Sequence, residues 1–129
     1  MIVDTSAVVA VVLGEPDAER YAEALTRPGL RLLSAVNLVE AGIVVEARQG
    51  PDAARDLTLL LETTTVTVEP VDDAQARLAV DAWRRFGKGR HPAGLNLGDC
   101  FAYALAKAYG DPLLFTGNDF SQTDVASVL

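Results

Sequence analysis

Apolar residues along the chain fall into short continuous runs and longer stretches with helical spacing. The short runs are rich in β-branched residues or leucine, which predicts strands at residues 1–3, 30–33, 63–69 and 113–115 and a last edge strand at 125–129. The longer stretches predict helices, and they cover residues 7–13, 18–25, 35–48, 52–62, 73–86 and 99–109. Strands that alternate with helices favour a mostly parallel sheet covered by helices on both faces.

Capping and turn residues mark the ends of these elements. Asp17 and Ser34 are typical N-caps for the helices that follow them. The stretch 99–109 is apolar on almost every face, which predicts a buried helix after the glycine-rich loop at 87–98. The sequence has no internal repeat, low-complexity stretch or linker, so we expect residues 1–129 to form a single domain.

Composition and charge narrow the classes of function. Half of the residues are apolar, which suits a packed core, and the formal net charge is −7. This charge argues against a protein that binds nucleic acid through its overall electrostatics, so any such activity must depend on a local site. The single cysteine, Cys100, excludes an intrachain disulfide. The N-terminus lacks the basic start of a signal peptide and no run could span a bilayer, so we expect a cytoplasmic protein with no membrane partner.

Four acidic residues follow predicted strands or begin predicted helices. Asp4 comes directly after the first strand, and Asp119 follows the fourth strand after a tight turn. Glu40 lies in the second turn of the helix after the second strand, and Asp99 in the first turn of the buried helix. Ligands of open parallel sheets bind beyond the carboxyl ends of the strands. Asp4, Glu40 and Asp119 should therefore lie near one edge, which Asp99 joins if its helix begins there.

Each of these residues also has a purely structural explanation. Asp4 and Asp99 could cap helices, and Asp119 could serve a turn. Glu40 is harder to explain in this way, because it lies on a stripe of its helix that is otherwise mostly apolar. A carboxylate on a packed face needs a partner or a metal ion.

Considered together, the four carboxylates predict a metal site. Converging carboxylates repel one another and raise one another's pKa values, and a divalent cation removes that cost. Oxygen ligands suit Mg²⁺ or Mn²⁺. Such an ion can activate a water molecule and orient a phosphodiester, which predicts metal-dependent hydrolysis. The candidate metal ligands and catalytic residues are Asp4, Glu40, Asp99 and Asp119.

Three segments carry a resemblance to a known family. They are IVDTSAVVAVVLGEP at the start, LSAVNLVEAGIVVE in the middle and LNLGDCFAYALAKAYGDPLLFTGNDFSQTDV near the end. In these segments the chain resembles the PIN-domain ribonucleases and, among them, the VapC-type toxins of bacterial toxin–antitoxin pairs. The resemblance covers essentially the whole chain, and Asp4, Glu40 and Asp99 match the first three acidic positions of the family.

The resemblance implies a fold, an activity and partners. The implied fold is a PIN-like three-layer α/β/α sandwich with a short, mostly parallel sheet. The implied activity is that of a Mg²⁺- or Mn²⁺-dependent endoribonuclease, the toxin of a type II toxin–antitoxin system, which hydrolyses RNA phosphodiester bonds. The implied partners are the RNA substrate, a cognate antitoxin protein and a second copy in a homodimer. The exposed faces of the helices before and after Pro28 could serve the antitoxin or the dimer.

The sequence leaves the fourth acidic position and the surroundings of the site open. Many relatives carry two acidic residues where this chain has Asn118 and Asp119; we assign the role to Asp119, with Asn118 as the alternative. Asp124 is a further candidate at the margin of the site. Residues that could orient carboxylates or water, or act only as caps and turn residues, are Thr5, Ser6, Thr116 and Asn118.

A short basic run precedes Asp99. It could contact the RNA backbone near the acidic site, or it could be a solvated helix end that the helix dipole favours. Its members are Arg84, Arg85, Lys88, Arg90 and His91. Trp83 and Phe86, three residues apart, are expected to pack in the core, and so is Cys100.

Two other functions compete with the nuclease. A phosphatase could use Asp4 as a covalent nucleophile, but enzymes of the haloacid dehalogenase type usually have a second aspartate two residues later, where this chain has Ser6. A non-catalytic protein-interaction module of the same fold would need the acids only as caps. Binding of divalent ions distinguishes this module from the nuclease.

Overall fold

A four-stranded parallel sheet forms the centre of the molecule. The computed structural model describes residues 1–129. The strands lie in the order β3-β2-β1-β4, and every neighbouring pair is parallel. They are β1 (Ile2–Val3), β2 (Leu32–Ser34), β3 (Thr67–Glu69) and β4 (Leu113–Leu114).

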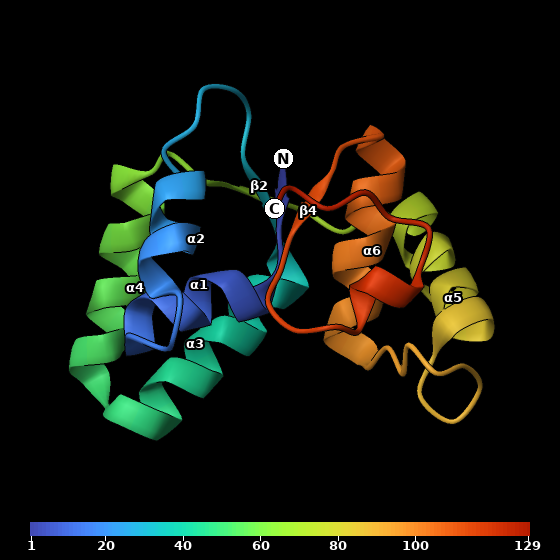
Figure 1. Cartoon of the computed structure of the whole chain (residues 1–129), viewed down its shortest axis with the longest axis horizontal. Helices are drawn as coiled ribbons and strands as arrows, with labels where there is room; N and C mark the ends of the chain where they lie inside the picture. The colour runs from blue at the N-terminus through green and yellow to red at the C-terminus, as the bar shows by residue number, and fades with distance from the viewer.

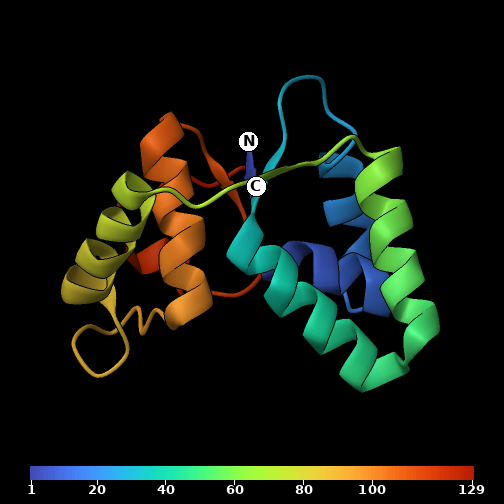
Figure 2. The same cartoon turned by 180° about the vertical axis from the view of Figure 1, so that it is seen from behind.

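Helices cover both faces of this sheet. They are α1 (Thr5–Leu13), α2 (Ala18–Ala24), α3 (Ala35–Gln49), α4 (Pro51–Thr63), α5 (Asp73–Phe86) and α6 (Leu97–Tyr109), with a short 3₁₀ turn at Phe120–Gln122. Figure 1 shows the strands between α1–α4 on one side and α5 and α6 on the other, and the reverse view in Figure 2 shows the same division. The predicted three-layer α/β/α sandwich is confirmed. No helix combines the length and the apolar character needed to cross a membrane.

The two layers have separate cores because side chains alternate along each strand. Val3, Leu33 and Leu114 are buried against α1–α4. Ile2, Leu32 and Leu113 are buried on the opposite face, against α5 and α6. All six are at most 3% exposed, so short strands of two or three residues suffice to separate two cores.

Helix caps place two helix starts at the carboxyl edge of the sheet. Asp4 follows β1 and its side chain caps α1 by accepting from the backbone N–H of Ser6. Ser34 ends β2 and caps α3 by accepting from Val36 N. Since β1 and β2 are parallel neighbours, α1 and α3 begin side by side. The residues of their first turns therefore lie at the same edge.

Several predicted boundaries differ from the structure. The strand predicted at 63–69 is shorter because α4 continues through Thr63, whose hydroxyl bonds back to the carbonyl of Leu59. Asp17 does precede α2, but it adopts a left-handed backbone (φ 67°) and makes no capping hydrogen bond. The edge strand predicted at 125–129 is wrong, because this segment forms only an isolated bridge between Leu113 and Ser127.

Candidate active site

Asp4 is a buried carboxylate with one unsatisfied oxygen. It is 2% exposed, at the end of β1. Its Oδ2 accepts from Ser6 N (2.9 Å) and Ser6 Oγ (2.5 Å), while its Oδ1 is buried with no hydrogen-bond partner. Burial raises the pKa of Asp4 from its usual 3.8 to about 6, against the lowering effect of the Ser6 bonds and with a further rise from the charge of Glu40. An orphaned buried oxygen of this kind calls for a ligand.

Ser6 connects Asp4 to the segment that follows β4. While its hydroxyl donates to Asp4, its oxygen accepts from the backbone N–H of Thr116 at 3.0 Å. Two residues that the sequence placed around the site, Ser6 and Thr116, therefore do lie beside Asp4. They hold the turn that carries Asp119 at the edge where β1 ends.

Glu40 reaches the same edge from the second turn of α3. Its Oε1 accepts a 2.5 Å hydrogen bond from the hydroxyl of Thr5, the residue after Asp4. Its carboxylate also lies against the backbone of Gly98, so closely that a Cβ at position 98 would overlap it. The half-buried Glu40 thus contacts both the start of α1 and the start of α6.

Asp99 lies in the first turn of α6 and takes part in a capping box. Its N–H donates to Asn96 Oδ1 (2.9 Å), and its Oδ2 accepts from Asn96 N (3.0 Å). The capping explanation for Asp99 is therefore correct. Burial raises the pKa of Asp99 from its usual 3.8 to about 7, although the Asn96 N–H acts in the opposite direction. The negative charges of the other three candidate carboxylates, Asp4, Asp119 and Glu40, raise the pKa of Asp99 further.

Asp119 completes the group from the solvent side. It is exposed at the start of the 3₁₀ turn and makes no capping hydrogen bond. Its negative charge raises the pKa of Asp99. The neighbouring Asn118 is also exposed, and its backbone carbonyl accepts from Ser121 Oγ. Of the two candidates for the fourth position, Asp119 is the one whose side chain acts electrostatically on the site.

The four carboxylates fit a hard divalent cation, but not as a closed cage. No three acidic, histidine or cysteine side chains lie close enough together to enclose a metal ion on their own. The donors are all oxygens, one is buried and unpartnered, and two carboxyls have raised pKa values. Mg²⁺ usually keeps several water ligands and needs only one or two direct carboxylates. The residues therefore fit an ion held partly through water.

Asn37 is a buried site residue that the sequence reasoning missed. It is fully buried on α3, and its Nδ2 donates to Thr5 Oγ1 (3.1 Å) and to the carbonyl of Gly98 (3.0 Å). The available signal was its position, one turn before Glu40 on the same otherwise apolar stripe. A buried amide there requires polar partners from other elements.

The predicted basic run is largely engaged in contacts within the protein. Arg85 pairs with Asp124 and donates to the hydroxyl of Tyr103. The Arg90 guanidinium lies over the ring of Trp83, 4.6 Å from its centroid. His91 Nδ1 accepts from Ala93 N, and its ring meets the buried ring of Phe86 edge-on.

Two members of the run and one marginal acid have other positions. Arg84 and Lys88 are exposed and form no ion pair. Asp124 does not join the four carboxylates. It pairs with Arg85 and Lys107 and accepts from Tyr103, contacts that lower its pKa to about 2 despite an opposing effect of burial.

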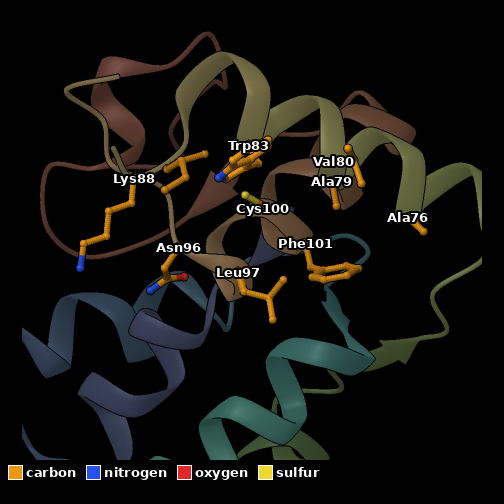
Figure 3. A pocket seen from close by; sticks show the side chains of 10 residues that line it. Ala76, Ala79, Val80, Trp83, Lys88, Asn96, Leu97, Cys100 and Phe101 are labelled. Atoms are coloured by element: carbon orange, nitrogen blue, oxygen red, sulfur yellow. The ribbon is translucent and has the colours of Figure 1, made fainter. Parts of the chain in front are cut away.

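An apolar hollow lies between α5 and the start of α6, next to the capping box of Asp99. Its volume is about 530 Å³, and Figure 3 shows Trp83, Leu97 and Phe101 around it. Phe86 is buried as predicted, but Trp83 is 45% exposed here, so its assignment to the core is wrong. Cys100 lines the hollow and is buried, as predicted.

The fold is a parallel sheet between two helical layers, and acidic residues lie at the carboxyl ends of its strands. The model of the PIN domain matches residues 1–126, and the chain belongs to the PIN-domain family. Within that family it belongs with the VapC ribonucleases, as its curated relatives show. It is 49% identical to Ribonuclease VapC30 of Mycobacterium tuberculosis over 128 residues, which cover 99% of this chain and 98% of that protein. It is 50% identical to Ribonuclease VapC of Mycolicibacterium smegmatis, covering 99% of each chain.

Solved structures agree on the fold. The crystal structure of Mycobacterium tuberculosis VapC20, described as a sarcin-ricin loop cleaving toxin, matches with a TM-score of 0.79 at 23% identity and covers 98% of this chain and 97% of that one. A toxin–antitoxin complex from Klebsiella pneumoniae matches with a TM-score of 0.71 at 17% identity, covering 95% and 92%. The resemblance identified from the three sequence segments is confirmed.

Proposed function

We propose that this protein is a Mg²⁺- or Mn²⁺-dependent endoribonuclease and the toxin of a type II toxin–antitoxin system. The observation that carries the metal site is the buried Oδ1 of Asp4, which has no hydrogen-bond partner; burial and the charges of the other three carboxylates also raise the pKa of Asp99 to about 7. Such a site favours a cation at neutral pH, because a cation offsets both the desolvation and the repulsion. Membership of the VapC ribonucleases supports RNA as the substrate.

The contacts and exposure of each site residue indicate the role that it would have. Asp4, through its unpartnered Oδ1, and Asp99 would hold the cation, with Glu40 as a ligand that acts through water. The Thr5 hydroxyl holds the Glu40 carboxylate in place, so that Glu40 can also orient the attacking water. Asp119, exposed at the mouth of the site, would complete the coordination through water, from the side on which RNA arrives. When bound, the cation would lower the pKa of water and stabilise the charge that develops on the phosphate.

The related structures and the exposed apolar residues support three kinds of partner for this protein: RNA, an antitoxin and a second copy of the chain. One structural neighbour cleaves the sarcin-ricin loop and another was solved as a toxin–antitoxin complex, which supports an RNA substrate and an inhibiting antitoxin for this chain. Val39 and Ile43 on α3 and Leu97 on α6 are each more than 60% exposed, which supports a homodimer that covers them. We also propose that the protein acts in the cytoplasm, where RNA is available.

RNA cleavage by the purified, antitoxin-free protein tests this function. With Mn²⁺, the wild type should cut structured RNA, and a substrate with a 2′-deoxy sugar at the cut should be cleaved equally well, because water rather than the 2′-hydroxyl attacks. Asp4→Asn keeps a capping oxygen for α1 but removes the charge, so it should lose cleavage while still folding. Cleavage that survives in EDTA, or in Asp4→Asn, would exclude the proposed mechanism.

A further inference from the structure

Asn37 is the one buried amide that contacts the starts of two other elements at the acidic edge. It is 0% exposed, and it lies one helical turn before Glu40 on α3. Its two hydrogen-bond acceptors belong to the residue after Asp4 and the residue before Asp99: Thr5 Oγ1 at 3.1 Å and the Gly98 carbonyl at 3.0 Å. One side chain therefore joins the segments that carry three of the four candidate carboxylates.

The chemistry of the acceptors fixes the direction of these bonds. The Gly98 carbonyl can only accept, so the amide nitrogen of Asn37 must face it. The same nitrogen donates its second hydrogen to Thr5 Oγ1, which leaves the single Thr5 proton for another acceptor. Glu40 Oε1 is at 2.5 Å from Thr5 Oγ1, whereas the backbone carbonyl of Asn37 is at 3.3 Å. The hydroxyl therefore donates to Glu40.

We propose that Asn37 is a positioning residue that sets the spacing of Asp4, Glu40 and Asp99 through the chain Gly98–Asn37–Thr5–Glu40. Asn37 is fully buried and makes no hydrogen bond to the candidate metal donors, so it acts only through Thr5 and Gly98. Groups behind metal ligands of this kind orient them, and their loss typically weakens metal binding by roughly 10–100-fold. The proposal deepens the proposed function and rests on it.

The second polar atom of the Asn37 amide makes no stabilising contact, and this argues for a positioning role rather than ordinary packing. Asn37 Oδ1 is buried and has no hydrogen-bond partner. A side chain present only to fill space would be more favourable without an unsatisfied oxygen. The amide is explained by the two donor bonds that it supplies to Thr5 and Gly98.

A double-mutant cycle with Mn²⁺ binding as the readout tests this proposal. Asn37→Ala and Thr5→Val should each raise the dissociation constant for Mn²⁺ by roughly 10–100-fold, measured by calorimetry. Because both changes interrupt the same chain, the double variant should be little worse than the more severe single variant. Thr5→Ser, which keeps the hydroxyl, should bind Mn²⁺ within a few-fold of the wild type. Additive losses in the double variant would overturn the proposal.

Val45→Ala is the matched control. Val45 is fully buried two turns further along α3, in the core between the sheet and α1–α4, and it makes no contact with Thr5, Gly98 or Glu40 through a polar atom. Its truncation should lower the melting temperature without changing the dissociation constant for Mn²⁺. An equal loss of Mn²⁺ binding in Val45→Ala and Asn37→Ala would reduce Asn37 to a general stabilising role.

A metal-free crystal structure separates this proposal from the proposed function. In Asn37→Ala, or in Thr5→Val if the first variant does not fold, the Glu40 carboxylate should leave its position against Gly98. Unchanged carboxylate positions would overturn the positioning role. A wild type that binds no Mn²⁺ would instead overturn the metal-dependent function, and this structural test would still stand.

Discussion

The carboxylate of Glu40 lies against the backbone of Gly98, where only a hydrogen fits. This contact brings α3 to the start of α6, one residue before Asp99. Gly98→Ala should displace the Glu40 carboxylate and lower the cleavage rate by about 10-fold or more, since misplaced catalytic groups are costly. The melting temperature should change little, because the displaced atoms are the end of a flexible side chain. The measurements are single-turnover cleavage and thermal unfolding.

Gly42→Ala is the control for this prediction. Gly42 also lies in a helix, and an added Cβ there would meet nothing within 4 Å. The substitution should leave cleavage unchanged and stabilise α3 by about 0.5–1 kcal/mol, from helix propensity. If both glycine variants cleave RNA equally well, the Glu40 position does not depend on Gly98.

The metal-free protein should lose stability as the pH rises from about 4 to about 7. The pKa values of Asp4 and Asp99 are raised from 3.8 to about 6 and about 7, so the folded state binds protons more tightly than the unfolded chain. Their contribution to stability is therefore greatest below about pH 4 and is lost between about pH 4 and 7. Thermal unfolding in EDTA across this range measures it. Asp99→Asn should flatten the decline, and a decline of the same slope in this variant would contradict the assignment.

Asp124 should matter for stability and not for catalysis. It pairs with Arg85 and Lys107 at the surface, and its pKa is lowered to about 2. Asp124→Asn should therefore lower stability at neutral pH by about 1 kcal/mol or less, as expected for exposed ion pairs. Its contribution is present above about pH 4 and is lost as the pH falls toward 2. Cleavage assays should show wild-type rates, and a large loss of rate would return Asp124 to the site.

Arg84 and Lys88 are the members of the basic run whose side chains make no ion pair, hydrogen bond or ring contact, and they should contact the RNA backbone. Replacing both with alanine should raise KM and reduce the salt dependence of RNA binding, by a slope of about one for each lost phosphate contact. Arg20→Ala, an exposed change on α2 in the opposite layer, is the control. An unchanged salt slope in the double variant would leave the run with a structural role only.

The sequence predicted most of the framework because its signals are local. Ser34 is a strong N-cap before a long helical pattern, and α3 begins where that cap places it. The helix at Asp73–Phe86 begins and ends as predicted. The prediction of a strand at 125–129 was wrong. The segment makes only one bridge, between Ser127 and Leu113, and the extent of such pairing is not determined by the local sequence pattern.

The position of the acidic residues at one edge of the sheet could be predicted for a similar reason, whereas the contacts that support them could not. Asp4 and Asp119 follow strands, so topology alone brings them to one edge. The role of Asn37 depends on contacts with Thr5 and Gly98, which lie 32 and 61 residues away in the chain. The pattern of apolar and polar residues around Asn37 does not predict these two partners. Trp83 was assigned to the core from helical spacing, and this spacing does not distinguish a fully buried helix face from a half-exposed one.

Mn²⁺ binding to the antitoxin-free protein tests the central claim most directly. Calorimetry at pH 7.5 should show binding to the wild type at millimolar or lower Mn²⁺, at least about tenfold weaker binding to Asp99→Asn, and still weaker binding once Asp4→Asn is added. Wild-type heats indistinguishable from dilution, or equal affinity in all three proteins, would show that these carboxylates do not hold the ion.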